Sequence, residues 1–92
     1  AYNDLMALGV LSYLAEHGVQ VPRQISVTGF DDILYAAMCS PALTTIAMPT
    51  EEAGKVAVDL LAARLDGAPA ELRELPTKLV IRASTRKHPM LA

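Results

Sequence analysis

Residues 25–32 read ISVTGFDD, a short run rich in β-branched residues that leads through a glycine and an aromatic ring to two acids. Because Ile, Val, Thr and Phe favour an extended chain, this composition predicts a strand over residues 25–30. Asp31 and Asp32 then follow at its carboxyl end. Ligands of open α/β sheets bind at the carboxyl ends of the strands, so the two acids are candidates for the rim of a binding pocket.

A helix and then a loop are predicted before this strand. Asn3 is a good N-cap, because its side-chain oxygen can accept from a free amide of the first turn. Asp4 places negative charge where the helix dipole favours it. Gly18 ends the helix, since glycine tolerates the left-handed conformation. A helix followed by a loop and a strand is half of a βαβ unit with a parallel sheet. The predicted class is therefore α/β, with Asn3 and Asp31 at the same end of the layer.

The remaining chain alternates short strands with helices. We expect a helical turn over residues 33–38, a strand over 43–47, a helix over 50–66 and a last strand over 77–84. Thr50 is the candidate N-cap of the long helix. Apolar side chains of this helix fall on one stripe and predict a buried face: Ala53, Val56, Ala57, Leu60, Leu61 and Leu65.

Composition limits the classes of function. Of 92 residues, 52% are hydrophobic and 4% aromatic, which is enough for one small aliphatic core. The formal net charge of −2 is unlike the basic face of a DNA-binding domain. The single Cys39 excludes an internal disulfide and suits a reducing cytosol.

Targeting signals are not visible in the sequence. No apolar run approaches the roughly 18 residues of a membrane span, and no signal peptide is recognisable. We therefore expect a cytoplasmic protein that has no membrane partner. The chain runs directly into a helix from Ala1, which predicts a fragment whose preceding strand lies outside it.

Asp31 is the strongest candidate for ligand binding. Its carboxylate can accept hydrogen bonds from two neighbouring hydroxyl groups, which suits a sugar or a ribose. The alternative is that Asp31 or Asp32 caps the turn after the strand. Our interpretation is that the two acids divide these roles, so that one faces the pocket and the other caps the turn. Asn3 can both donate to and accept from a polyol, although its role as an N-cap already accounts for it.

Metal and catalytic chemistry have weaker support. Paired acids after a strand can hold Mg²⁺ in a phosphoreceiver domain, but such a site also needs an acceptor aspartate on another strand. His17 and His88 lack the spacing to a nucleophile or a metal ligand. Cys39 lies beside Met38 in an apolar stretch and suits packing or an interface. We expect no enzyme activity, cofactor, metal or catalytic residue, with an α/β enzyme or phosphoreceiver as the alternative.

Four motifs, in order along the chain, resemble the lactose-repressor-like (LacI/GalR) transcription regulators. Residues 3–9, NDLMALG, are similar to the family's Asn-Asp-x-x-Ala-x-Gly motif. Residues 21–32, VPRQISVTGFDD, resemble its Val-Pro-x-x-(Ile/Val)-Ser-Val-x-Gly-(Phe/Tyr)-Asp-Asp motif. Residues 41–46, PALTTI, resemble Pro-x-Leu-Thr-Thr-(Ile/Val), and residues 75–85, LPTKLVIRAST, resemble the closing strand. Together the four motifs span nearly the whole chain.

The resemblance implies a fragment of a sensor domain of the periplasmic-binding-protein type I, in which two α/β lobes with parallel sheets close on a small-molecule effector. Residues 1–48 would belong to the C-terminal lobe, 49–75 would pack in the N-terminal lobe, and 76–92 would return to the C-terminal lobe. The implied function is to bind a sugar or nucleoside-like effector and couple it to operator affinity in a repressor. A periplasmic sugar-binding protein of a transport system is the alternative.

The resemblance also assigns roles to residues. Asn3 and Asp31 match positions that contact effector, and Thr50 and Ala53 match positions on the other wall. A homodimer surface is implied for Leu8, Leu11 and Ser12 in the first helix and for Met38 and Cys39 further along the chain. For the three residues in the helix, ordinary core is the alternative. Operator DNA would be contacted only through a headpiece that this chain does not contain.

Overall fold

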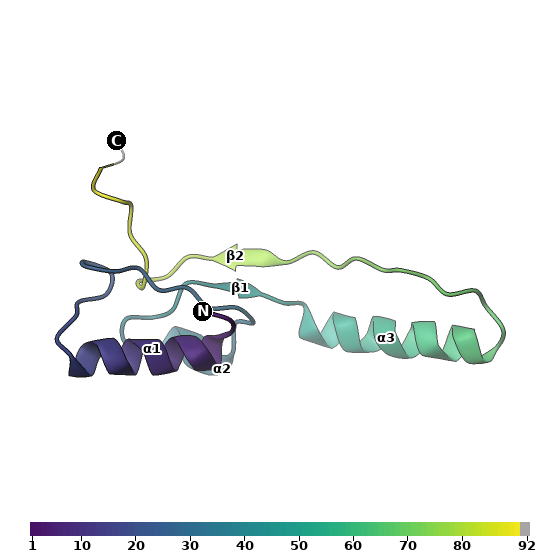
Figure 1. Cartoon of the computed structure of the whole chain (residues 1–92). Coiled ribbons are helices and arrows are strands. Elements are labelled where there is room, and N and C mark those ends of the chain that lie inside the picture. Colours follow the sequence, from purple (N-terminus) through teal and green to yellow (C-terminus); the bar gives the residue numbers. More distant parts are fainter. Residues whose placement is uncertain (91–92) are drawn as a thin grey trace. The chain divides into compact units, whose positions relative to one another are not determined.

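The computed structural model describes residues 1–90. The chain combines helices and strands, as predicted for an α/β fragment (Figure 1). Their order is α1 (Asp4–Glu16), α2 (Leu34–Met38), β1 (Thr45–Ala47), α3 (Thr50–Leu65) and β2 (Lys78–Val80). The chain divides into two compact units. The first unit joins Ala1–Ala47 to the segment that starts at Lys78, and the second unit is Met48–Thr77.

Strand β1 lies at the centre of the first unit. It pairs with β2 in antiparallel register, with Thr45 opposite Val80. Its other edge has two isolated parallel bridges, from Thr28 to Thr44 and from Asp31 to Ala47. The strand that we predicted over residues 25–30 is therefore only an extended segment, because its hydrogen bonds to β1 do not form a continuous ladder.

Strand β2 is shorter than predicted. A strand was expected over residues 77–84, but β2 ends at Val80. It runs antiparallel to β1. Beyond it, the Arg82 N–H donates to Thr44 Oγ1 over 2.9 Å, and the Ala83 N–H donates to the Ala42 carbonyl over 3.0 Å. These bonds end the regular ladder and turn the chain toward the start of β1.

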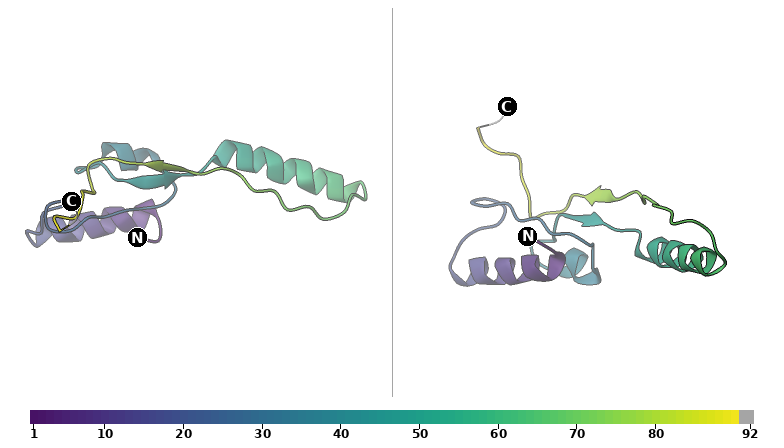
Figure 2. Two further views of the ribbon diagram at one scale, coloured as in Figure 1. Left: turned by 90° about the horizontal axis from the view of Figure 1, so that it is seen from above. Right: turned by 45° about the vertical axis from the view of Figure 1, so that its right-hand side comes forward.

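The core of the first unit lies between the helices and the extended segments. Figures 1 and 2 show α1 and α2 on the same face of the β1–β2 pair. The core is aliphatic, as the composition predicts, and consists of Ala7, Leu11, Val27, Ala36 and Leu43.

Ser84 joins three segments that are distant in sequence. Its side chain is fully buried. Its Oγ donates to the Val27 carbonyl over 2.6 Å and accepts from the Thr44 N–H over 2.8 Å. The return segment after β2 is thus held by one hydroxyl group against both the segment before Asp31 and the start of β1.

The second unit contains α3, whose beginning differs from the prediction. Pro49 occupies the N-cap without a side-chain cap bond, and Thr50 is the first helical residue. The Ala53 N–H donates to the Pro49 carbonyl over 2.8 Å, so the helical ladder starts one residue earlier than a Thr50 cap requires. No residue of α3 is buried within the described chain, so residues 1–90 do not cover its apolar stripe. Within residues 1–90, none of the helices has the length and apolarity needed to cross a membrane.

Candidate functional site

Four residues from two segments line an open hollow of about 550 Å³ at the start of α1: Tyr2, Asn3, Phe30 and Asp31. A backbone hydrogen bond joins the two segments, because the Asp4 N–H donates to the Phe30 carbonyl over 3.0 Å. The Asp31 N–H donates in turn to the Ile46 carbonyl over 2.9 Å. The structure therefore brings together Asn3 and Asp31, the two residues that the sequence singled out for ligand binding.

Asn3 caps α1 and still has hydrogen-bonding groups for a ligand. Its Oδ1 accepts from the Met6 N–H over 2.9 Å, which confirms the predicted cap. Residues 1–90 provide no partner for its side-chain nitrogen, which can therefore donate to a ligand. Capping and ligand binding are compatible at Asn3, because they use different atoms of one amide.

Asp31 presents its carboxylate at the rim of the hollow. The residue is exposed, and within the described chain its side chain makes no hydrogen bond, so both oxygens can accept from a ligand. Its φ of 121° lies in a region that residues other than glycine rarely occupy. Such backbone costs on the order of 1–3 kcal/mol and is concentrated at functional sites.

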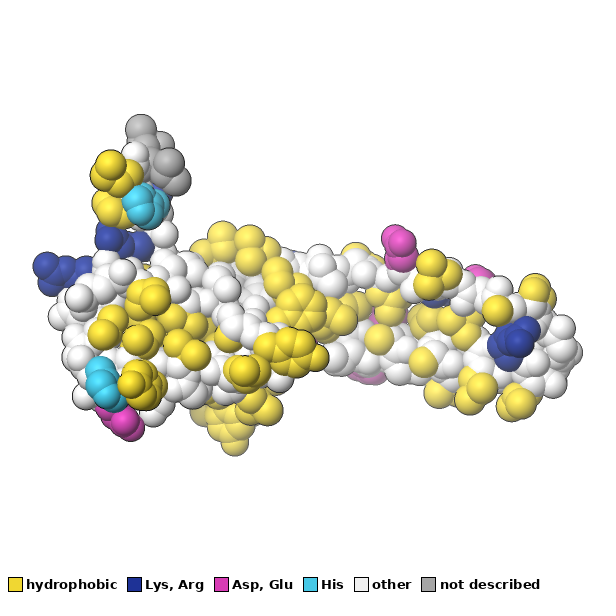
Figure 3. Space-filling model, viewed as in Figure 1, with side chains coloured by type: hydrophobic (Ala, Val, Ile, Leu, Met, Phe, Trp, Pro, Cys, Tyr) yellow, Lys and Arg dark blue, Asp and Glu magenta, His cyan; other side chains and the backbone are white. Residues whose placement is uncertain are grey.

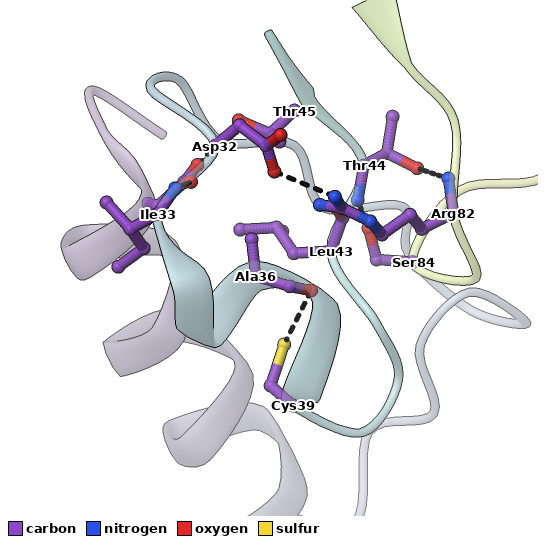
Figure 4. Close-up of polar contacts among 10 residues, drawn as sticks. Asp32, Ile33, Ala36, Cys39, Leu43, Thr44, Thr45, Arg82 and Ser84 are labelled. Carbon is purple, nitrogen blue, oxygen red and sulfur yellow. Dashed lines mark hydrogen bonds and ion pairs between the residues drawn. The ribbon is translucent and has the colours of Figure 1, made fainter. Parts of the chain in front are cut away.

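Asp32 has a different role from the one we predicted. One of the two acids was expected to cap the following turn, but the N-cap of α2 is Ile33, which makes no side-chain cap bond. Instead, Asp32 Oδ1 accepts from Arg82 Nη2 over 2.8 Å (Figure 4). Asp32 is therefore the partner of an arginine that lies 50 positions away in sequence.

The structural role of Asp4 was not predicted from the sequence. Asp4 was assigned to the helix dipole, yet its side chain is fully buried. Its Oδ1 accepts from Thr45 Oγ1 over 2.6 Å, and its Oδ2 accepts from the Ile33 N–H over 2.8 Å. Spacing alone does not distinguish a buried acid from an exposed one in a first helical turn. Asp4 fixes the start of α1 to β1 and to the segment that follows Asp31.

Gly29 permits this close approach. A Cβ atom added to Gly29 would overlap the Asp4 carboxyl group and press on the Leu43 side chain. Only a residue without a side chain lets the extended segment pass this close beneath the first turn of α1. Gly29 therefore helps to place Asn3 and Asp31 at the same hollow.

The two candidates for an opposite wall lie in the second unit. Thr50 is exposed at the first position of α3, and Ala53 is partly exposed one turn later. Their assignment to the effector site remains a proposal.

The residues predicted for a dimer surface differ in exposure. Met38 is 68% exposed and Ser12 is also exposed. Leu8 and Cys39 are half-buried, and Cys39 Sγ lies 3.3 Å from the Pro41 carbonyl oxygen. Leu11 is only 8% exposed and packs in the core, so we remove it from the proposed surface.

The histidines have local partners. His17 stacks on Tyr13 with a ring separation of 4.0 Å, and His88 Nδ1 accepts from the Met90 N–H over 3.1 Å. Among residues 1–90, no three side chains of His, Cys, Asp and Glu gather closely enough to hold a metal ion.

Comparison with known proteins gives consistent matches. Residues 1–85 match the family model of the periplasmic binding protein-like domain. The chain is 42% identical over 88 residues to the lactose operon repressor of Rhizobium radiobacter. The aligned region covers 95% of this chain and 78% of that protein. The chain is also 41% identical over 90 residues to the transcriptional repressor CytR of Escherichia coli K12. This aligned region covers 96% of this chain and 26% of that repressor.

Similar solved structures are also regulators of the LacI family. A LacI family regulator from Arthrobacter sp. FB24, in complex with lactose, superposes with a TM-score of 0.78 at 41% identity over 94% of this chain. The lac repressor dimer bound to operator and an anti-inducer superposes with a TM-score of 0.84 at 38% identity over 91% of this chain. This chain spans 33% and 30% of those two structures, and about a quarter of the length of CytR.

Proposed function

Since the chain belongs to the LacI family of transcriptional regulators and to its periplasmic-binding-protein-like domain, we propose that it binds a small-molecule effector that carries several hydroxyl groups. The observation that carries this proposal is the meeting of Asn3 and Asp31 at one open hollow. The Asn3 amide nitrogen supplies a donor and the Asp31 carboxylate supplies acceptors. A hydroxyl group can use both, because it donates one hydrogen bond and accepts others.

The aromatic residues of the hollow support a ring-shaped effector. Tyr2 is 83% exposed and Phe30 is 39% exposed, beside the two polar side chains. Apolar walls with a few oriented polar groups are the usual composition of small-molecule sites. A sugar or nucleoside-like ring, with apolar faces and hydroxyl groups at its edge, suits this combination. The similar Arthrobacter regulator was solved with a sugar, lactose.

At the level of the whole protein, we propose a cytoplasmic repressor in which effector binding shifts an equilibrium between open and closed lobes. Residues 1–48 and 76–92 would belong to one lobe and 49–75 to the other, with Thr50 and Ala53 on the opposite wall. A DNA-binding headpiece outside this chain would respond to the shift by changing its operator affinity. The similar proteins are named as repressors, so the comparisons favour a regulator over a transport protein or an enzyme.

Effector binding can be tested by calorimetric titration of the protein at its natural length with lactose, ribose and adenosine. We expect saturable binding of at least one of the three, because each presents vicinal hydroxyl groups on a ring. A double variant with Asn3→Ala and Asp31→Ala should lose that binding. The proposal is wrong if none of the three ligands binds, or if the double variant binds as tightly as the native protein.

We also propose that the face around α2 pairs two copies of the chain. Large apolar side chains are exposed on this short helix: Leu34 is 75%, Tyr35 61% and Met38 68% exposed. Figure 3 shows such exposed hydrophobic side chains gathered on the surface of the first unit. Apolar patches of this kind commonly mark protein interfaces. The similar lac repressor was solved as a dimer.

Met38→Glu tests the pairing. We expect it to weaken self-association at least tenfold, since a charge would have to lose its hydration in an apolar contact. Sedimentation equilibrium measures the dissociation constant of the dimer. Met90→Glu is the matched control, because it adds the same charge at a methionine that is 84% exposed in the C-terminal segment. Equal dissociation constants for the two variants would contradict the α2 interface.

A further inference from the structure

The backbone at Asp31 and Asp32 has an unusual conformation. Their φ values are 121° and 60°, in the region that favours glycine. Backbone of this kind persists only when surrounding contacts hold it in place. The contacts that hold these two residues therefore also determine where the Asp31 carboxylate points.

Backbone hydrogen bonds hold the residues on either side of Asp32. The Phe30 carbonyl accepts from the Asp4 N–H, and the Asp31 N–H donates to the Ile46 carbonyl. The Ile33 N–H donates to Asp4 Oδ2 over 2.8 Å. Within the described chain, Asp32 itself is held through its side chain, which accepts from Arg82.

Arg82 is well placed to hold Asp32. Its Nη2 donates to Asp32 Oδ1 over 2.8 Å, and its Nη1 donates to the Leu43 carbonyl over 3.0 Å (Figure 4). The side chains of Arg82 and Asp32 are only 19% and 26% exposed, so salt screens their attraction less than that of a surface pair. The planar guanidinium group can bind both acceptors at once, which a lysine could not do with the same geometry. The Arg82 N–H is itself fixed by Thr44 Oγ1.

We propose that Arg82 is a positioning residue of the effector site: by binding Asp32, it holds the strained turn that directs the Asp31 carboxylate into the hollow. This inference rests on the proposed function of Asp31 as an effector ligand. Arg82 follows β2 and so belongs to the segment on which the chain returns from the second unit. Arg82 therefore ties the binding residue to the segment that re-enters the first unit.

The first test uses Arg82→Gln and needs no ligand. In the protein at its natural length, we expect amide hydrogen exchange of residues 30–33 to become at least tenfold faster, because the turn loses its side-chain restraint. Arg86→Gln is the matched control. Arg86 also donates to two backbone carbonyls, those of Pro22 and Arg23, but away from the hollow. Unchanged exchange of residues 30–33 in Arg82→Gln would overturn the proposal.

The second test separates positioning from general stability. Lactose is the first probe, followed by ribose and adenosine. Arg82→Gln should raise the effector dissociation constant about tenfold, and Arg82→Lys should raise it less. The dissociation constant of Arg86→Gln should stay within twofold of the native value. In a protein that already carries Asp31→Ala, Arg82→Gln should have no further effect, since its influence acts through Asp31. Equal weakening in both backgrounds would indicate a purely structural role and would overturn the inference.

The two proposals fail in different ways. If Asp31→Ala weakens binding and Arg82→Gln does not, the positioning role is wrong and the effector role of Asp31 stands. If Asp31→Ala leaves binding unchanged, the effector role of Asp31 is wrong and the positioning role of Arg82 falls with it.

Discussion

Asp31→Ala is expected to weaken effector binding by about 1.5–3 kcal/mol, the usual worth of a hydrogen bond to a charged group. At 25 °C this corresponds to a rise of roughly 10- to 150-fold in the dissociation constant. The reason is that the carboxylate of Asp31 stands free at the hollow with two acceptor oxygens, and alanine leaves the ligand hydroxyl groups without their partner. Titration calorimetry of the native protein and the variant measures the difference.

Glu16→Ala is the control for this substitution. Glu16 is an exposed acid at the opposite end of α1, so its removal changes the net charge equally without changing the hollow. We expect its dissociation constant to stay within twofold of the native value. An unchanged dissociation constant for Asp31→Ala, with the fold intact by circular dichroism, would contradict the proposed role of Asp31.

Asp4→Ala is expected to lower the free energy of unfolding by about 3–5 kcal/mol, among the larger effects of single substitutions. The side chain is fully buried and accepts from both Thr45 Oγ1 and the Ile33 N–H. Alanine would leave the buried Thr45 hydroxyl and the partly buried Ile33 N–H without an acceptor, and each buried donor left unpaired costs about 1–3 kcal/mol. Urea denaturation followed by circular dichroism measures the change.

Asp59→Ala is the matched control for this stability measurement. Asp59 is an exposed aspartate of α3, and surface substitutions of this kind usually change stability by less than about 0.5 kcal/mol. A loss below about 1 kcal/mol for Asp4→Ala would show that the buried carboxyl group does not hold α1 against β1. The account of how the hollow is built would then be wrong.

Local sequence patterns predicted much of the first unit. The cap at Asn3 and the end of α1 near Gly18 follow from the chemistry of single residues, and the structure confirms the cap. The turn over residues 33–38 and the strand at 43–47 are present as α2 and the shorter β1. The family resemblance, based on four motifs, is confirmed by the match over residues 1–85.

Long-range partners were not predictable in the same way. Asp4 binds Thr45 at a separation of 41 positions, and Asp32 binds Arg82 at a separation of 50. Local patterns report on neighbours within a few positions, so they indicated a dipole role for Asp4 and a capping role for one of the two acids, Asp31 or Asp32. The pairing of β2 with β1 was not predicted either, because strand pairing depends on contacts far along the chain.

The beginning of α3 shows a different limit. Thr50 is a better capping residue than Pro49 by its side chain, which is why Thr50 was predicted at the cap. The backbone carbonyl of Pro49 nevertheless starts the helical ladder, which places Thr50 inside the helix. Capping preference predicted the position of this helix to within one residue but not the residue at its cap.

The most direct test of the account is a crystal structure of the protein at its natural length with a bound hydroxyl-rich effector. We predict ligand hydroxyl oxygens within about 2.5–3.2 Å of the Asp31 carboxylate and of the Asn3 side-chain nitrogen. An effector that is bound elsewhere, with Asn3 and Asp31 facing only water, would contradict the central claim that these two side chains form the effector site.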